Sequence, residues 1–118
     1  MDDTDLNKPD APDDSAGFDD LAGALLLDVR RTAAYEAAAS VIPGSSWHDP
    51  ANVAAWAGSL PAGRPVVVYC VHGHEVSQGT AAQLRAAGLN ARYLRGGISA
   101  WQAAGRPLQA KGAASSNG

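Results

Sequence analysis

Apolar residues in the middle of the chain form short runs that are separated by segments with a helical pattern. Residues 24–29 (ALLLDV) and residues 66–70 (VVVYC) are almost continuously apolar, as expected for strands that are buried on both faces. Residues 41–42 and 92–94 are shorter strand candidates, and a Pro-Gly turn signal closes the first of them. The pattern predicts strands of a parallel sheet, because strands of antiparallel sheets usually alternate apolar and polar positions.

Helices are expected between and after these strands. Their predicted ranges are 32–39, 50–58, 77–87 and 98–104. Asp49 before Pro50 is a typical helix start, and Thr32 is placed to cap the first helix through its hydroxyl. Gly88 and Gly105 follow the last two helices, where glycine commonly ends a helix. Strands that alternate with helices predict an α/β fold, in which right-handed crossovers place helices on both faces of a parallel sheet.

Charge divides the chain into a core and two polar ends. Residues 1–20 hold eight of the 12 acidic residues but one of the 9 basic residues, so the remainder carries a net charge of plus 4. Residues 1–15 are acidic and contain proline, and residues 109–118 are rich in small residues, so we expect both segments to be disordered. The sequence therefore predicts one folded domain at residues 16–108.

Composition excludes several classes of protein. The chain of 118 residues has about the size of one domain and contains no apolar run of about 18 residues that would span a membrane. Residues 1–10 lack the basic and apolar regions of a secretory signal, so a cytoplasmic location is expected. The sequence contains no basic run with interleaved aromatic residues, which does not favour nucleic-acid binding. One cysteine forms no internal disulfide, which leaves either an inert buried thiol or a reactive one.

That cysteine, Cys70, begins the segment CVHGHEV at residues 70–76. It follows the clearest strand, and in open α/β sheets ligands bind beyond the carboxyl ends of the strands. We expect the backbone amides of the segment, together with the N-terminus of the next helix, to face the sulfur and stabilise a thiolate. Gly73 fits such a loop because a residue without Cβ tolerates a sharp turn. The segment therefore predicts a nucleophilic cysteine.

Four motifs follow one another along residues 16–108. They are LLLDVR at 25–30, IPGS at 42–45, VVVYC at 66–70 and LRGGISAW at 94–101. In this combination they resemble the rhodanese (sulfurtransferase) domain family. The resemblance implies a three-layer α/β fold with a central parallel five-stranded sheet and helices on both faces. It also implies that the cysteine takes a sulfane sulfur from thiosulfate, mercaptopyruvate or a persulfide donor, which includes a protein persulfide. The resulting cysteine persulfide passes the sulfur to cyanide or a thiol, and no cofactor is implied.

The resemblance also implies roles for individual residues. Cys70 is the catalytic persulfide carrier, and an active-site loop binds the substrate through its backbone amides. The loop residues are Val71, His72, Gly73, His74, Glu75, Val76 and Ser77. Asp28 and Arg30 match an Asp-x-Arg motif that supports the active-site face, and a structural ion pair is the simpler interpretation of both. The LRGGISAW motif is structural in the family and receives no catalytic role.

Two positions depart from the family pattern. Many rhodaneses have a six-residue loop before the serine, whereas this loop has seven residues, as in related cell-cycle phosphatases and some arsenate reductases. Val76 occupies the place of their arginine, so a phosphatase or arsenate reductase activity lacks the guanidinium that binds the transferred oxyanion. Glu75 is the second departure, because its carboxylate repels a dianion such as thiosulfate unless protonated His72 and His74 offset it. The physiological donor is therefore left open.

Two further hypotheses stand beside the sulfurtransferase. One is a metal site formed by Cys70, His72 and His74 at alternating positions, which we disfavour because amides that face the sulfur push neighbouring side chains outward. The other is a rhodanese-like binding or sensing module, in which the loop recognises an anion, or the domain docks a partner, without turnover. The cysteine favours catalysis, whereas Glu75 and the absence of a loop arginine keep the binding module open.

Overall fold

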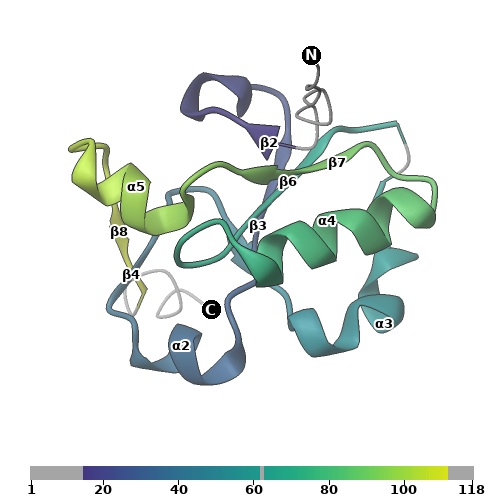
Figure 1. Cartoon of the computed structure of the whole chain (residues 1–118), viewed down its shortest axis with the longest axis horizontal. Coiled ribbons are helices and arrows are strands. Elements are labelled where there is room, and N and C mark those ends of the chain that lie inside the picture. The colour runs from purple at the N-terminus through teal and green to yellow at the C-terminus, as the bar shows by residue number, and fades with distance from the viewer. Residues whose placement is uncertain (1–14, 62, 112–118) are drawn as a thin grey trace, which may run out of the picture.

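A sheet of five parallel strands forms the centre of the molecule (Figure 1). The structure is a computed structural model that describes residues 15–61 and 63–111. The sheet contains β2 (Ser15–Ala16), β7 (Ala91–Leu94), β6 (Val66–Tyr69), β3 (Leu25–Asp28) and β5 (Ser46–Trp47), in that spatial order. Every neighbouring pair in it is parallel. The predicted α/β fold with a central parallel five-stranded sheet is therefore confirmed.

Helices cover both faces of this sheet. The helices are α2 (Thr32–Ala37), α3 (Val53–Ala57), α4 (Glu75–Ala86) and α5 (Gly97–Ala103), and there are 3-10 turns at η2 (Phe18–Asp20) and η3 (Pro50–Asn52). Because successive residues of a strand point to opposite faces, Val66 and Val68 pack with residues of α3 and α4, whereas Val67 and Tyr69 pack with residues of α5. Within residues 15–61 and 63–111, no helix has the length and apolar character needed to cross a membrane.

The carboxyl ends of the parallel strands meet at one edge of the sheet. Cys70 directly follows β6, and Asp28 ends the neighbouring strand β3. His48 follows β5, and its backbone N–H donates to the Asp28 carbonyl at 2.9 Å. The chain then turns into α4 at Glu75, which brings the N-terminus of that helix to the same edge. The topology therefore places the residues after β3, β5 and β6 along the same edge of the sheet as Cys70.

A second sheet of two strands lies outside the central one. It pairs β4 (Ser40–Val41) with β8 (Gln109–Ala110) in antiparallel orientation. The strand predicted at residues 41–42 therefore exists, but it belongs to this small sheet. Pairing of β8 corrects the expectation that the disordered tail begins at residue 109, and pairing of Ser15 in β2 corrects its assignment to the disordered N-terminal segment. Residues 1–14 and 112–118, which make up the rest of the predicted disordered ends, lie outside the described residues.

Helix starts differ from the predicted ones at several places, and α3 begins only at Val53, after the 3-10 turn η3. Asp49 caps η3 as predicted, since the backbone N–H of Ala51 donates to its carboxylate at 3.0 Å. α2 already includes Thr32, so Arg31 is the N-cap residue and the predicted threonine cap is wrong. α4 begins at Glu75, two residues before the predicted start, because the first helical hydrogen bond runs from Gln78 to the carbonyl of His74.

Candidate functional site

Cys70 lies at the carboxyl end of β6 with its side chain almost buried. Its exposed fraction is 6%, and its Sγ donates a hydrogen bond of 3.1 Å to Oγ of Ser77, which is fully buried. A pocket of about 270 Å³ opens onto the cysteine. It is lined by Arg30, Arg31, Ala34, Cys70, Val71, His72, His74, Glu75 and Val76. The thiol is therefore shielded by the fold but reachable from this pocket.

The segment after Cys70 is divided between a loop and a helix. Residues 71–74 form the loop, whereas Glu75, Val76 and Ser77 form the first turn of α4. The seven-residue loop expected from the sequence is thus four residues and one helical turn. In the described part of the chain, no backbone N–H from residue 71 to residue 77 donates to another protein group. The seven N–H groups of the segment that follows Cys70 therefore have no protein acceptor and are available to an anion.

Gly73 is the point where this loop touches the LRGGISAW motif. Its φ is +73°, and a Cβ there would lie 2.6 Å from the backbone nitrogen of Gly96. Such a distance is a steric clash with the backbone, so only glycine fits. Close packing of two backbones, and not the sharp turn alone, therefore requires glycine at this position.

The start of α5 supports the loop from the other side. Backbone N–H groups of Ile98 and Ser99 donate to the carbonyls of Cys70 and Val71 at 3.0 and 2.9 Å. A Cβ on Gly97 would lie 2.4 Å from the Cys70 carbonyl oxygen, so this approach also depends on a glycine. The C-terminal motif holds the two residues at the base of the loop in place, which gives its structural role a physical cause.

Asp28 and Arg30 form a buried ion pair beside the pocket. Nη2 of Arg30 lies 2.6 Å from Oδ2 of Asp28, and Nε donates to Oδ1 at 2.9 Å. Nη2 also donates to the Ser40 carbonyl at 3.1 Å. Burial by itself would lower the pKa of Arg30, but the hydrogen bond and charge of Asp28 outweigh it and raise that pKa. The pair joins β3 to β4, and Arg30 contributes to the wall of the Cys70 pocket.

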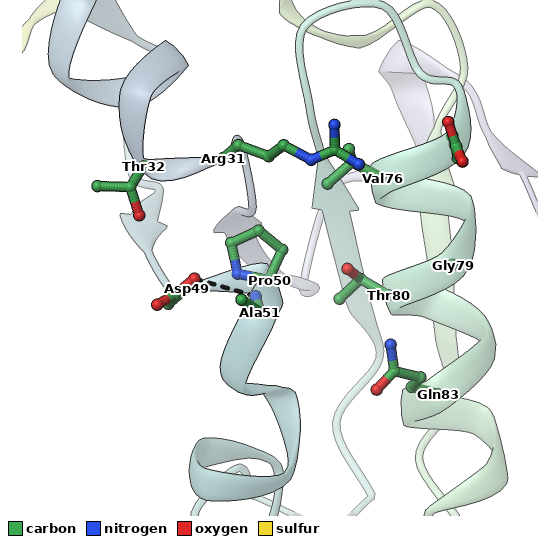
Figure 2. Close-up of a pocket in the computed structure, with 10 residues that line it drawn as sticks. Arg31, Thr32, Asp49, Pro50, Ala51, Val76, Gly79, Thr80 and Gln83 are labelled. Carbon is green, nitrogen blue, oxygen red and sulfur yellow. Dashed lines mark hydrogen bonds between the residues drawn. The ribbon is translucent and has the colours of Figure 1, made fainter.

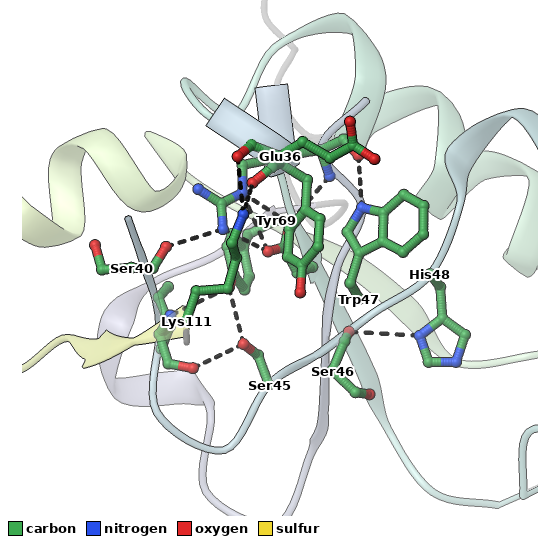
Figure 3. A network of polar contacts seen from close by, with 12 residues as sticks. Glu36, Ser40, Ser45, Ser46, Trp47, His48, Tyr69 and Lys111 are labelled. Carbon is green, nitrogen blue, oxygen red and sulfur yellow. Dashed lines mark hydrogen bonds and ion pairs between the residues drawn. The ribbon is translucent and has the colours of Figure 1, made fainter. Parts of the chain in front are cut away.

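Tyr69 has a role that its apolar strand context did not reveal. Its buried hydroxyl accepts a hydrogen bond of 3.1 Å from the Ile42 N–H and lies 2.8 Å from Oγ of Ser45 (Figure 3). The Ser45 hydroxyl donates to the Ile42 carbonyl at 2.7 Å, so Tyr69 is the donor toward Ser45. Burial raises the pKa of Tyr69 to about 12. The IPGS turn is thereby attached to the residue before Cys70.

The two histidines and the two unexpected residues lie at the mouth of the pocket. His72 and His74 are exposed, with their ring centroids 6.0 Å apart. Glu75 is the first residue of α4, where a negative charge complements the helix dipole. Val76 is half-buried and packs against the core cluster under α3 and α4. An apolar packing contact therefore explains valine at the position where the related phosphatases have arginine.

The structure brings Arg31 to this site, which sequence reasoning did not single out. Arg31 is exposed and lines the Cys70 pocket together with a second pocket of about 460 Å³ (Figure 2). Figure 2 shows its guanidinium reaching from the start of α2 toward Val76. A signal was present, because Arg31 follows β3 by three residues, and β3 ends at the same sheet edge as β6.

The metal hypothesis receives no support from the geometry. In residues 15–61 and 63–111, no group of three or more His, Cys, Asp or Glu side chains is arranged to hold a metal ion. The groups that the structure does bring to this pocket include a sheltered thiol and a nearby guanidinium.

Comparison with known proteins relates this site to one family. A family model described as "Rhodanese-like domain" matches residues 13–104. A rhodanese-related protein from Thermoplasma volcanium has 26% identity and a TM-score of 0.71, with 80% of this chain and 96% of that chain covered. A search of curated proteins finds no match.

Two other solved structures bear on the possible activities. A thiosulfate sulfurtransferase from Pseudomonas aeruginosa has 27% identity and a TM-score of 0.68, with 82% of this chain but only 19% of that chain covered. A protein from Rhodopseudomonas palustris described as a possible tyrosine phosphatase has 23% identity and a TM-score of 0.70, with 81% and 84% covered. At that identity the second likeness shows the fold alone.

Proposed function

The chain belongs to the rhodanese-like domain family, and on this premise we propose that it is a sulfurtransferase whose Cys70 carries a sulfane sulfur as a persulfide. The observation that carries the proposal is the position of the thiol. Cys70 lines a pocket, its thiol donates to Ser77, and it is followed by residues 71–77, whose backbone N–H groups have no protein acceptor. A nucleophile with preorganised donors around it is suited to transfer of an anionic group.

The first half-reaction loads the cysteine. The Cys70 thiolate attacks the outer sulfur of thiosulfate, the S–S bond of the donor breaks, and its electron pair leaves with sulfite. The outer sulfur of the new persulfide carries one negative charge. In this proposal the N–H groups of residues 71–77, which have no protein acceptor, stabilise that charge. The Ser77 hydroxyl accepts a hydrogen bond from the thiol and is able to rotate and donate one to the thiolate.

The second half-reaction returns the cysteine to its starting state. An acceptor thiol loses its proton to solvent, and its thiolate attacks the outer sulfur of the persulfide. The bond between that sulfur and Sγ breaks, Cys70 regains its negative charge, and the acceptor leaves as a persulfide. Each step replaces one sulfur nucleophile by another, so donor and acceptor use the same pocket in turn and ping-pong kinetics follow.

Asp28 and Arg30 act as positioning residues in this proposal. Both are buried, and their ion pair satisfies both charges inside the protein. The backbone carbonyl of Arg30 also accepts a hydrogen bond of 2.8 Å from Nε1 of Trp47. These contacts maintain one wall of the Cys70 pocket while the exchange occurs above it.

Intact mass after incubation with a donor tests the proposal. Incubation with thiosulfate, mercaptopyruvate or a low-molecular-weight persulfide is expected to add the mass of one sulfur atom. Cyanide or dithiothreitol should remove that mass, and Cys70→Ser should never acquire it. Absence of the gain with all three donors would overturn the sulfurtransferase and leave the rhodanese-like binding module.

One observation favours a second candidate, a phosphatase-like activity. Val76 cannot bind a transferred oxyanion, but the Arg31 guanidinium lies beside the same pocket. A free guanidinium near a cysteine nucleophile is the pairing that such enzymes need. Release of phosphate from a generic aryl phosphate by the wild type, lost in Cys70→Ser, would support this candidate.

A further inference from the structure

The Cys70 pocket is continuous in its lining with the larger one beside it. The two pockets share Arg31, Glu75 and Val76, and together they measure well above the size of a small inorganic anion. The larger pocket, of about 460 Å³, lies within the range of sites for organic ligands, which is roughly 300–1,000 Å³. Thiosulfate needs the smaller pocket alone, so the larger one has space for a group attached to the reacting sulfur.

Arg31 is the charged group at the boundary of the two pockets. Among the described residues its guanidinium makes no hydrogen bond or ion pair with another side chain, and it is exposed. Figure 2 shows it extended over the larger pocket toward Val76. Arginine matches a carboxylate with two parallel hydrogen bonds, which a lysine cannot reproduce. An unoccupied guanidinium at this position is therefore suited to a carboxylate on the substrate.

Gly79 keeps the opposite wall of the larger pocket open. It lies inside α4 and lines this pocket but not the Cys70 pocket. A Cβ at Gly79 would meet no atom within 4 Å, so packing does not require glycine there. Glycine inside a helix lowers its stability relative to alanine. The residue leaves space over the helix surface that any larger side chain would fill.

The remaining walls combine apolar residues, which include Pro50 and Ala51, with several polar ones. Thr32 and Asp49 contribute from the side of α2 and η3, and Thr80 and Gln83 contribute from α4 (Figure 2). One oxygen of the Asp49 carboxylate accepts a hydrogen bond from the Ala51 N–H. The other oxygen is left for a cationic group. With the Arg31 guanidinium at one end and the carboxylates of Asp49 and Glu75 in its lining, the pocket has a partner for the carboxylate and partners for the ammonium of an amino-acid-like group.

We propose that the larger pocket binds the organic part of a low-molecular-weight thiol or persulfide that bears a carboxylate, and that Arg31 binds this carboxylate. This inference rests on the sulfurtransferase proposed above and names the class of its acceptor or donor, an amino-acid or peptide thiol. The sulfur of the ligand reaches Cys70 in the smaller pocket, and its backbone or carboxylate end occupies the larger one. The transfer step is the second half-reaction, in which the thiolate of this ligand attacks the outer sulfur of the Cys70 persulfide.

The test follows discharge of the loaded cysteine. Protein is loaded to completion with thiosulfate, loading is checked by intact mass, excess donor is removed, and loss of the persulfide is timed with glutathione or with 2-mercaptoethanol. Glutathione has carboxylates and 2-mercaptoethanol has none. Arg31→Gln should lower the second-order rate with glutathione about tenfold or more, as expected for loss of a charge-assisted bidentate contact, and should change the rate with 2-mercaptoethanol less than about twofold.

Two controls make the result specific. Arg64→Gln removes the same charge from an exposed residue before β6, at the opposite end of the strand from Cys70, and should leave both rates unchanged. Gly79→Met fills the larger pocket and should slow discharge of the persulfide by glutathione but not by 2-mercaptoethanol. Ala82→Met is its control, because it places the same side chain on an exposed position of α4 outside both pockets.

The outcomes separate the inference from the function on which it rests. Failure of the wild type to load sulfur contradicts the sulfurtransferase itself. Full loading followed by equal effects of Arg31→Gln on the two thiols, or by no effect on either, overturns the carboxylate subsite alone. Equal effects of Gly79→Met and Ala82→Met would likewise contradict use of the larger pocket.

Discussion

Tyr69 shows how one residue connects the strand before Cys70 to a distant turn. Its hydroxyl is in contact with the Ile42 N–H and with Ser45, and its ring packs with the residues under α5. The neighbouring Cys70 shares the same backbone, so any shift of Tyr69 moves the thiol as well. The two hydrogen bonds of the Tyr69 hydroxyl therefore explain why this strand carries a buried polar group next to Cys70.

Alkaline pH provides a test of the Tyr69 environment. Its pKa is raised to about 12, so the stability that it contributes is fully present below its unfolded pKa of about 10 and is lost as pH rises through 12. We expect the free energy of unfolding to fall by up to about 1.4 kcal/mol per pH unit between these values. Urea melts of the wild type and of Tyr69→Phe from pH 8 to 12 measure how the free energy of unfolding depends on pH.

The phenylalanine variant has two separable effects. Below pH 10 it should be less stable by about 1–3 kcal/mol, because the buried Ile42 N–H loses its acceptor. Above pH 10 its stability should depend less on pH than that of the wild type. Parallel pH curves for the two proteins would contradict the assigned environment of Tyr69.

At the scale of secondary-structure elements, α4 combines a packing role with a chemical one. Its first turn supplies Ser77 to the thiol and places Val76 against the core, while Glu75 complements the helix dipole. In the proposed sulfur transfer, the acid that opposes an anionic donor is therefore favourable for the stability of the helix it begins. Glu75 therefore has opposite effects on helix stability and on the affinity for an anion.

Replacement of Glu75 separates these two requirements. Glu75→Gln should lower the Michaelis constant for thiosulfate by up to about fivefold, because repulsion of roughly 1 kcal/mol per charge pair in a watery setting is removed. The same change should lower the free energy of unfolding by about 0.3–1 kcal/mol through the helix dipole. Steady-state kinetics and urea melts measure the two effects.

Glu36→Gln is the matched control for this prediction. Glu36 is exposed on α2 and lines neither of the two pockets, so the same change in charge should leave the Michaelis constant unaltered. An equal change in both variants would mean that net charge, and not the position of Glu75, determines the affinity for thiosulfate.

At the scale of the whole molecule, the C-terminal segment closes the fold over α2. β8 pairs with β4, and Nζ of Lys111 donates to the backbone carbonyls of Tyr35 and Glu36 (Figure 3). The same ammonium lies 4.4 Å from the centroid of the Tyr35 ring. Residues distant in sequence thereby hold the element that carries Arg31 at its start.

Truncation measures this contribution. A chain that ends at Leu108 should unfold with a free energy about 1–3 kcal/mol lower than one that ends at Lys111, because the hydrogen bonds between β4 and β8 and the cation–π contact are lost. Both truncated chains lack residues 112–118, so the comparison isolates residues 109–111. Equal denaturant midpoints would show that β8 contributes no stability.

The sequence by itself determined the parallel α/β fold, the strand that carries Cys70, the Asp49 helix cap and the order of the family motifs. These features depend on local patterns, since a strand buried on both faces must be apolar throughout and a cap needs a particular side chain. The edge strands β2, β5 and β8 have two residues each and were not predicted, because strands so short exist only through hydrogen bonds to their neighbours.

Tertiary structure alone decided which groups surround the thiol. Arg31 reaches the pocket because β3 and β6 are adjacent and parallel, and Gly73 meets Gly96 because α5 starts under the loop. The start of α4 at Glu75 turned an expected loop into a helix terminus. Such juxtapositions join residues dozens of positions apart, and local sequence patterns contain no record of the distances between them.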